Sequence, residues 1–175
     1  LGDVYKRQSM ICSGDAGVYG MAGLMYELSE EWPDIEIKVI PGVTAATGGA
    51  AVLGAPLIHD FALISLSDLL TPWEKIEKRL LLASEADFVI CLYNPSSRKR
   101  STYLAKACEI MLEYKAEDTV CGIVKNIARE GETMQTLTLK ELKETTVDMF
   151  STVFIGNKQT KVIREKMVTP RGYRI

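Results

Sequence analysis

Three short segments that contain glycine or polar residues follow apolar runs, and their residue types could form a ligand site. They are residues 13–20, 41–45 and 93–97. In open α/β sheets, ligands bind outside the carboxyl ends of the strands, where loops vary without disturbing the core. Glycines let the backbone approach a ligand closely, and neighbouring helix N-termini supply free N–H donors. The sequence therefore predicts one ligand site built from these three segments.

The first segment leaves two interpretations open. Its glycines, Gly14, Gly17 and Gly20, do not follow the G-x-G-x-x-G spacing of dinucleotide-binding loops. One interpretation is a tight turn in which Asp15 caps the following helix. The other is a ligand loop, where an acidic side chain favours a ligand with hydroxyls or a positive centre. That chemistry favours S-adenosylmethionine over a dinucleotide. The second segment, 41–51, also suits a small-residue helix packed on a sheet.

Two further groups of residues could take part in chemistry. Arg98, Lys99 and Arg100 follow two serines that suit a helix N-cap, and they form either a solvated turn or a polyanion site. Cations in a first helical turn oppose the helix dipole, which favours the second interpretation. His59 and Asp60 offer an acid–base pair, although a lone histidine after a proline turn is more often structural.

Apolar runs alternate with helical periodicity along the chain, which indicates an α/β protein with a largely parallel or mixed sheet. Strands are predicted at residues 9–12, 35–40, 61–66, 88–93, 119–125, 133–139 and 152–155. Helices are predicted at residues 18–32, 44–53, from Pro72 onward, along the stripe 103–114, and as a turn at 140–144. A domain boundary is predicted near residues 56–60.

Composition excludes several classes of protein. The chain has 175 residues, 47% of them hydrophobic, and a formal net charge of −2. A general nucleic-acid binder would be basic, and no apolar run reaches the ~18 residues that span a bilayer. Cys12, Cys91, Cys108 and Cys121 are scattered, which predicts buried reduced thiols and a cytoplasmic location. With a single histidine, we predict no metal site.

Long motifs in this chain resemble the cobalamin-pathway tetrapyrrole methylases. Residues 13–23 resemble the family's S-G-D-P-G-x-Y-G-M-A segment, with Ala16 in place of the proline, and residues 41–46 match P-G-V-T-A. Residues 54–68 and 92–98 are similar to the precorrin-3B or cobalt-factor III C-17 methyltransferase branch. The resemblance extends from Ile11 to Asn157.

This resemblance implies two α/β domains with S-adenosylmethionine bound in the cleft between them. It implies C-methylation at C-17 with ring contraction of a tetrapyrrole, and a homodimer. Aerobic and anaerobic branches share these motifs, so they do not distinguish a cobalt-containing substrate from a cobalt-free one. Residues 9–58 would be the C-terminal part of the first domain, and residues 59–175 the second domain.

The resemblance also assigns residues to the site. Cofactor contacts are expected from Ser13, Gly14, Asp15, Val18, Thr44, Ala45, Tyr93, Asn94, Ile127 and Ala128. The substrate's carboxylates need cations, for which the candidates are Arg98, Lys99, Arg100, Lys125 and Arg129. Ring contraction needs proton transfers, for which His59 is one candidate and the missing N-terminal segment of the family is the other source.

Residues 1–8 do not match the family, so we expect an N-terminally truncated member without the first strand and its G-x-G-P-G loop. The first domain would then be incomplete, and a non-catalytic fragment is one alternative. A sibling methylase that acts at another ring carbon is a second. A nucleotide-binding reductase is a third, but it requires G-x-G-x-x-G and an acidic residue about 20 positions later.

Overall fold

The computed structural model describes residues 8–173, so the predicted non-family segment 1–8 lies outside the described residues except for Gln8. The chain divides into two compact units, Leu1–Thr44 and Ala45–Ile175. The predicted boundary at 58/59 concerns the domains of the family and stays a prediction. Helix α2 (Ala45–Leu53), which that prediction placed in the first domain, belongs to the second compact unit of this chain.

The first unit contains helix α1 (Ala22–Ser29) and otherwise turns and extended backbone over residues 8–44. The strands predicted at 9–12 and 35–40 are wrong, because no strand forms in that described range. A strand needs a neighbour for its backbone hydrogen bonds, and here Ile11 is 95% exposed. The predicted helix 18–32 is shorter at both ends. It starts late because residues 13–20 form a turn, and it stops before Pro33, which disfavours helix in the preceding residue.

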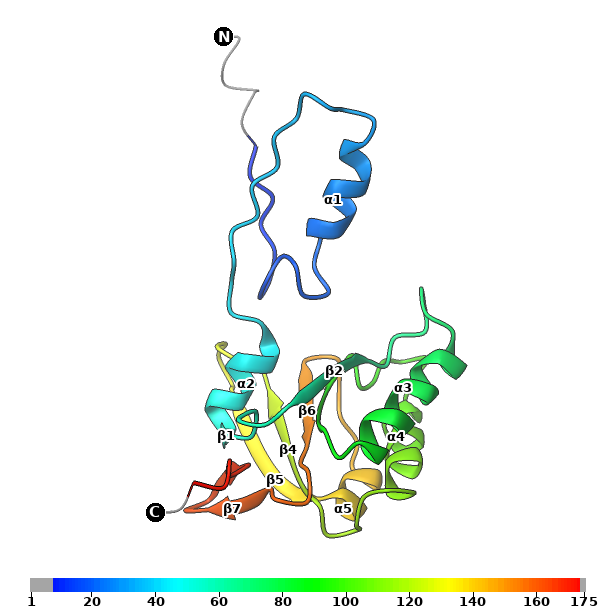
Figure 1. Ribbon diagram of the computed structural model, residues 1–175, viewed down its shortest axis with the longest axis vertical. Helices are drawn as coiled ribbons and strands as arrows, with labels where there is room; N and C mark the ends of the chain where they lie inside the picture. The colour runs from blue at the N-terminus through cyan, green and yellow to red at the C-terminus, as the bar shows by residue number, and fades with distance from the viewer. Residues whose placement is uncertain (1–7, 174–175) are drawn as a thin grey trace. The chain divides into compact units, whose positions relative to one another are not determined.

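The second unit is built on a five-stranded mixed sheet with the order β2-β3-β6-β4-β5. The strands are β2 (Phe61–Ser65), β3 (Val89–Tyr93), β6 (Ser151–Ile155), β4 (Val120–Lys125) and β5 (Thr133–Thr138). Strand β2 is parallel to β3, whereas β6 is antiparallel to both β3 and β4. Strands β2, β3 and β4 therefore run in the same direction, and their carboxyl ends lie at one edge of the sheet (Figure 1).

The two faces of this sheet are covered by different helices. Ile90 and Leu92 of β3 pack with α3 (Trp73–Glu85), α4 (Tyr103–Leu112) and α5 (Leu139–Lys143). Cys91, between them, packs with α2 on the other face, because successive strand residues point to opposite sides. Strand β3 is thus covered on both faces, as its continuous apolar run predicts.

Helix α2 packs closely because its residues are small. A Cβ at Gly49 would lie 3.0 Å from the ring of Phe154 in β6. On β4, a Cβ at Gly122 would lie 2.6 Å from Leu53 of the helix. The predicted small-residue packing of this segment is therefore confirmed.

A second sheet of three short strands escaped the sequence prediction. Strand β1 (Gly54–Ala55) is parallel to β8 (Lys166–Val168), which is antiparallel to β7 (Lys161–Ile163). Each has two or three residues, too few to show a period of two. None of the described helices is long and apolar enough to cross a membrane. Of the cysteines, Cys91, Cys108 and Cys121 are buried as free thiols, and Cys12 is half-buried.

A buried lysine joins two strands at the amino edge of the parallel pair. Lys115 Nζ donates hydrogen bonds to the carbonyl oxygens of Phe88, at 2.9 Å, and Gly156, at 3.0 Å. It also lies 3.6 Å from the Asp87 carboxylate, and its side chain is 2% exposed. Burial lowers the pKa of Lys115, although the nearby Asp87 opposes this shift. The ammonium group therefore fixes the start of β3 against the end of β6.

Substitution Lys115→Met should destabilise the protein by about 2 kcal/mol, because it removes the donor to a buried carbonyl oxygen, that of Gly156, and to a partly buried one, that of Phe88. The free energy of unfolding is measured by urea titration. Lys78→Met is the matched control, since Lys78 is exposed on α3 and should change stability by less than about 0.5 kcal/mol. Equal effects of the two substitutions would contradict this role of Lys115.

Candidate functional site

Asp15 joins the first two predicted segments within the first unit. Its Oδ1 accepts a hydrogen bond from the backbone N–H of Gly17 at 2.8 Å, and its Oδ2 accepts one from that of Gly42, also at 2.8 Å. These N–H donors, Gly42 first, hold the pKa of Asp15 below its ordinary value. Asp15 does not cap α1, whose N-cap is Met21, so the predicted cap is wrong, whereas the predicted turn is present. The carboxylate instead shapes the turn and holds residues 41–44 beside it.

Glycines are required where these two segments meet. A Cβ on Gly42 would overlap the carbonyl oxygen of Gly14, and a Cβ on Gly20 would overlap that of Ala16. Gly14 itself has φ +78°, in the left-handed region that favours glycine. A Cβ at Gly14 would be in van der Waals contact with the backbone of Val43 and Thr44. The first unit therefore brings Ser13, Gly14, Asp15 and Thr44 together, and Ser13 and Gly14 are exposed there.

The second unit gathers its predicted cofactor residues at the carboxyl edge of β2, β3 and β4. Tyr93 ends β3, and its hydroxyl accepts a 2.6 Å hydrogen bond from the Ala46 N–H at the start of α2. Asn94 follows with φ +53° and donates from Nδ2 to Ser65 Oγ at 2.9 Å. The tyrosine thus satisfies one of the free N–H groups at the start of this helix.

Residues 126–128 after β4 lie at the same edge. Asn126 and Ala128 both have positive φ, at +53° and +56°, a conformation that costs energy in residues with a side chain. The loop is closed by the Ala128 N–H, which donates to Glu132 Oε2 at 2.7 Å. Ile127 packs toward α2, since its Cδ1 lies 2.9 Å from where a Cβ on Gly49 would be. Backbone held in such conformations is typical of functional loops.

The predicted substrate-binding cations fall into different environments. Arg100 donates to Ser67 Oγ at 2.7 Å and lies 3.5 Å from Asp68 Oδ1, while Lys125 pairs with Asp148 at 2.7 Å. Arg98, Lys99 and Arg129 are exposed. The prediction that the basic residues occupy a first helical turn is wrong, because α4 begins only at Tyr103. The helix-dipole argument for a polyanion site therefore does not apply.

His59 lies at the opposite edge of the sheet. It precedes β2, whereas Tyr93 ends the parallel β3 and Asn94 follows it, so the two positions are separated by roughly 20 Å at ~3.3 Å per residue. Its Nε2 is buried and has no hydrogen-bond partner. A hollow of about 510 Å³ is lined there by His59, Asp60 and Arg171, among others. The structure does not bring His59 together with the predicted cofactor residues of this unit.

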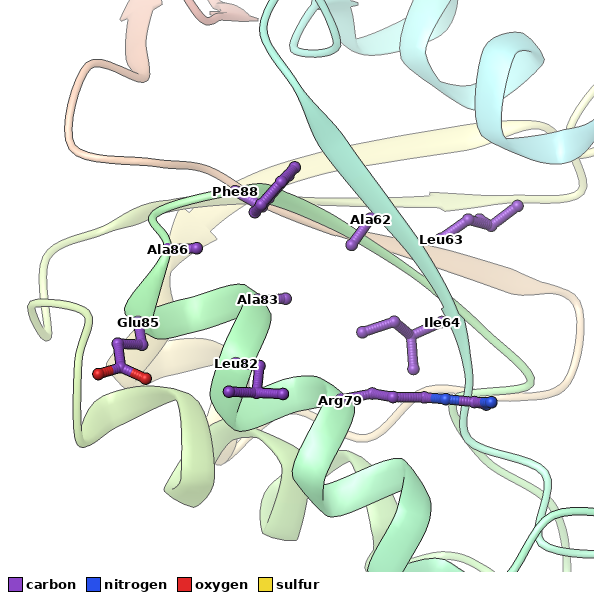
Figure 2. A pocket seen from close by; sticks show the side chains of 9 residues that line it. All are labelled: Ala62, Leu63, Ile64, Arg79, Leu82, Ala83, Glu85, Ala86 and Phe88. Atoms are coloured by element: carbon purple, nitrogen blue, oxygen red, sulfur yellow. The ribbon is translucent and has the colours of Figure 1, made fainter.

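A second hollow also lies away from these loops. It has a volume of about 690 Å³ and lies between β2 and α3, lined by apolar side chains with Arg79 and Glu85 (Figure 2). None of the predicted site residues lines it. Within residues 8–173, no cluster of three or more His, Cys, Asp or Glu side chains could hold a metal ion. Sequence analysis missed Ser65, Ser67 and Asp68, which contact Asn94 and Arg100, although all three lie in the family-like stretch 54–68.

Comparison with known proteins identifies the family of this chain. The family model of tetrapyrrole (corrin/porphyrin) methylases matches residues 4–143. A probable cobalt-factor III C(17)-methyltransferase of Salmonella typhimurium is 52% identical, over 94% of this chain and 69% of that protein. The cobalt-factor III methyltransferase of Priestia megaterium is 46% identical over 96% of this chain, which spans about a third (32%) of that longer protein.

Solved structures agree with this assignment. The crystal structure of the methyltransferase CobJ matches with a TM-score of 0.83 and 34% identity, over 91% of this chain and 68% of that one. The Thermus thermophilus uroporphyrin-III C-methyltransferase, complexed with S-adenosylhomocysteine, shares the fold at 17% identity and a TM-score of 0.62, over 82% and 62% of the two chains. Because the family match covers most of the sequence, and relatives are similar along almost all of it, the chain belongs to the tetrapyrrole methylases.

Proposed function

We propose that this chain methylates a corrin precursor at C-17, with ring contraction, using S-adenosylmethionine in cobalamin biosynthesis. The observation that carries the proposal is the pair of hydrogen bonds that Asp15 accepts from Gly17 and Gly42, which we call the Asp15 clamp. The clamp joins the two loops whose sequences match the family's S-G-D and P-G-V-T-A segments. The names and the 46–52% identity of the cobalt-factor III methyltransferases support the C-17 reaction. They also favour a cobalt-containing substrate, which the sequence motifs leave open.

In each unit the described loops suit the cofactor. S-adenosylmethionine supplies a methyl group already activated on a sulfonium, so the protein must mainly orient the reactants and exclude water. Residues 13–15 and 44 are exposed or half-buried, and they lie beside the close approach of Gly14 and Gly42, which a side chain on Gly42 would fill. Residues 93–94 and 127–128 offer a second set of fixed backbone groups. Val18 and Ala45, both half-buried, complete the proposed contacts.

The cations that the structure leaves exposed are the candidates for the macrocycle's acetate and propionate groups. These are Arg98, Lys99 and Arg129, since arginine pairs with carboxylates in a two-pronged geometry. Arg100 and Lys125 already have acidic partners, so we propose that they hold loops in place. The proton transfers of ring contraction have no assigned residue in the described loops, and His59 stays a prediction with no support from its position.

We also propose a cytoplasmic homodimer. Three buried free thiols support a reducing location. Strand β2 is an edge strand with an apolar groove beside it, and such surfaces are typical of subunit contacts. Arg79 and Glu85 lie along α3 at that groove, about 9 Å apart on the helix axis. In a dimer with a two-fold axis at this groove, Arg79 of each copy would lie opposite Glu85 of the other copy.

Isothermal titration of S-adenosylhomocysteine into this chain should give saturable one-site binding. Incubation with S-adenosylmethionine and cobalt-factor III should add one methyl group to the macrocycle, located at C-17 by mass spectrometry and NMR. Methylation at another carbon would favour a sibling methylase, and binding without transfer would favour a non-catalytic chain. Binding of a nicotinamide dinucleotide with no binding of S-adenosylhomocysteine would overturn the proposal.

Substitution Asp15→Asn should weaken S-adenosylhomocysteine binding by about tenfold, because the amide replaces one acceptor with a donor that faces a backbone N–H. The dissociation constant is measured by calorimetry. Asp34→Asn makes the same chemical change at an exposed position of the same unit and should leave the constant unchanged. Unchanged binding in Asp15→Asn would show that the clamp does not shape the cofactor site.

Substitution Leu82→Glu should shift the protein from dimer to monomer, since it places a charge in the apolar groove beside β2. Sedimentation velocity measures the change. Val162→Glu is the control, because Val162 is similarly exposed, at 49% against 50%, but lies on β7. A monomeric wild-type chain, or an equal effect of both substitutions, would contradict this interface.

A further inference from the structure

We propose that Leu69, Leu70, Arg98 and Lys99 form one recognition surface for the macrocycle, and that Asp68, Arg100 and Tyr103 are positioning residues that hold it. This inference rests on the proposed function, whose site it extends. The two parts of the surface come from the loop after β2 and the loop after β3, which leave the same edge of the sheet.

A continuous set of hydrogen bonds connects this surface to the proposed cofactor residue Asn94. Asn94 Nδ2 donates to Ser65 Oγ at 2.9 Å, and the same oxygen accepts from the Ser67 N–H at 3.2 Å. Ser67 Oγ in turn accepts from the Arg100 guanidinium at 2.7 Å. The loop after β2 is therefore joined to the loop after β3 at two places, through Asn94 and through Arg100.

Asp68 completes the connection to α4. One oxygen lies 3.5 Å from Arg100 Nη1, and the other accepts a hydrogen bond from the Tyr103 hydroxyl at 2.7 Å. The Tyr103 hydrogen bond lowers the pKa of Asp68, and the same bond raises the pKa of Tyr103. The acceptor and the donor thus keep their protonation states around neutral pH. The Tyr103 ring also packs on Trp73, the first residue of α3, with ring centroids 4.5 Å apart.

This well-bonded loop presents two large apolar side chains to solvent. Leu69 is 81% exposed and Leu70 is 98% exposed, the highest value among the large hydrophobic residues in the described part of the chain. Fixing two adjacent leucines in water gains nothing for the free chain, because their apolar surface stays hydrated. Their position is explained by a ligand that covers them.

Two cations on the loop after β3, which the Arg100–Asp68 ion pair joins to this loop, indicate the chemistry of that ligand. Arg98 and Lys99 are exposed, and neither makes an ion pair or side-chain hydrogen bond within residues 8–173, whereas Arg100 beside them is 15% exposed and turned toward Asp68. A ligand that fits leucines next to free cations combines an apolar body with carboxylates at its rim. A tetrapyrrole with acetate and propionate side chains has this composition. A protein partner or an anionic membrane is an alternative occupant, which the experiment distinguishes.

The first test is the double substitution Leu69→Ser with Leu70→Ser. The KM for cobalt-factor III should rise about tenfold or more, while the dissociation constant of S-adenosylhomocysteine stays at the wild-type value. An unchanged KM would overturn the proposal. It would also be overturned if the variant kept the wild-type KM but no longer bound a protein partner or anionic vesicles that the wild-type chain binds. Loss of S-adenosylhomocysteine binding in the variant alone would show that the leucines are structural and would also overturn it. Failure of the wild-type chain to bind S-adenosylhomocysteine would instead count against the proposed function.

The second test concerns the positioning residues. Tyr103→Phe removes the donor to Asp68 and should raise the KM about threefold to fivefold, with kcat unchanged. In the Leu69→Ser, Leu70→Ser background the same change should have no further effect on KM, because the surface it positions is gone. Tyr114→Phe, at an exposed position of the same unit, is the control and should change neither constant. Additive effects of Tyr103→Phe and the leucine substitutions would overturn the positioning role.

Discussion

Strand β6 lies between β3 and β4 and is antiparallel to both, and the loops of the second unit depend on this arrangement. Two strands that each pair antiparallel with the same neighbour must run in the same direction. Tyr93 and residues 126–128 are therefore brought to one edge of the sheet, although more than 30 residues separate them in the sequence. Strand β2, parallel to β3, adds the loop with Leu69 and Leu70.

Carboxylates that bind the chain's own donors fix the loops in both units. Asp15 holds two backbone N–H groups from separate segments, and Asp68 holds a hydroxyl and a guanidinium. A charged acceptor makes stronger hydrogen bonds than a neutral one, which suits exposed loops that have little core to support them. The acidic residues of these loops are thus explained by local structure.

The parts that could be predicted from sequence are those decided by local pattern. Burial leaves a recognisable apolar pattern in the sequence, which is a continuous run in β3 and a stripe at helical spacing in α4. The apolar segments 9–12 and 35–40 have the same kind of pattern, but a strand also needs a partner, and none is present among the described residues. Arg100 illustrates a second limit on prediction. Its neighbours in sequence, Arg98 and Lys99, have the same charge, and only the tertiary contact with Asp68 distinguishes the ion-paired Arg100 from two exposed cations.

The same carboxylates determine how the loops respond to pH. A carboxyl group whose pKa is lower in the folded state stabilises the fold above its ordinary pKa, and this contribution is lost as the pH falls through the lower folded value. Hydrogen bonds lower the pKa of Asp15 and of Asp68 from an ordinary value of 3.8. Both connections therefore persist through neutral pH and are lost only in acid. A change in methyl transfer near neutral pH would then report on the reacting groups of the macrocycle or on other side chains, rather than on loosening of these two loops.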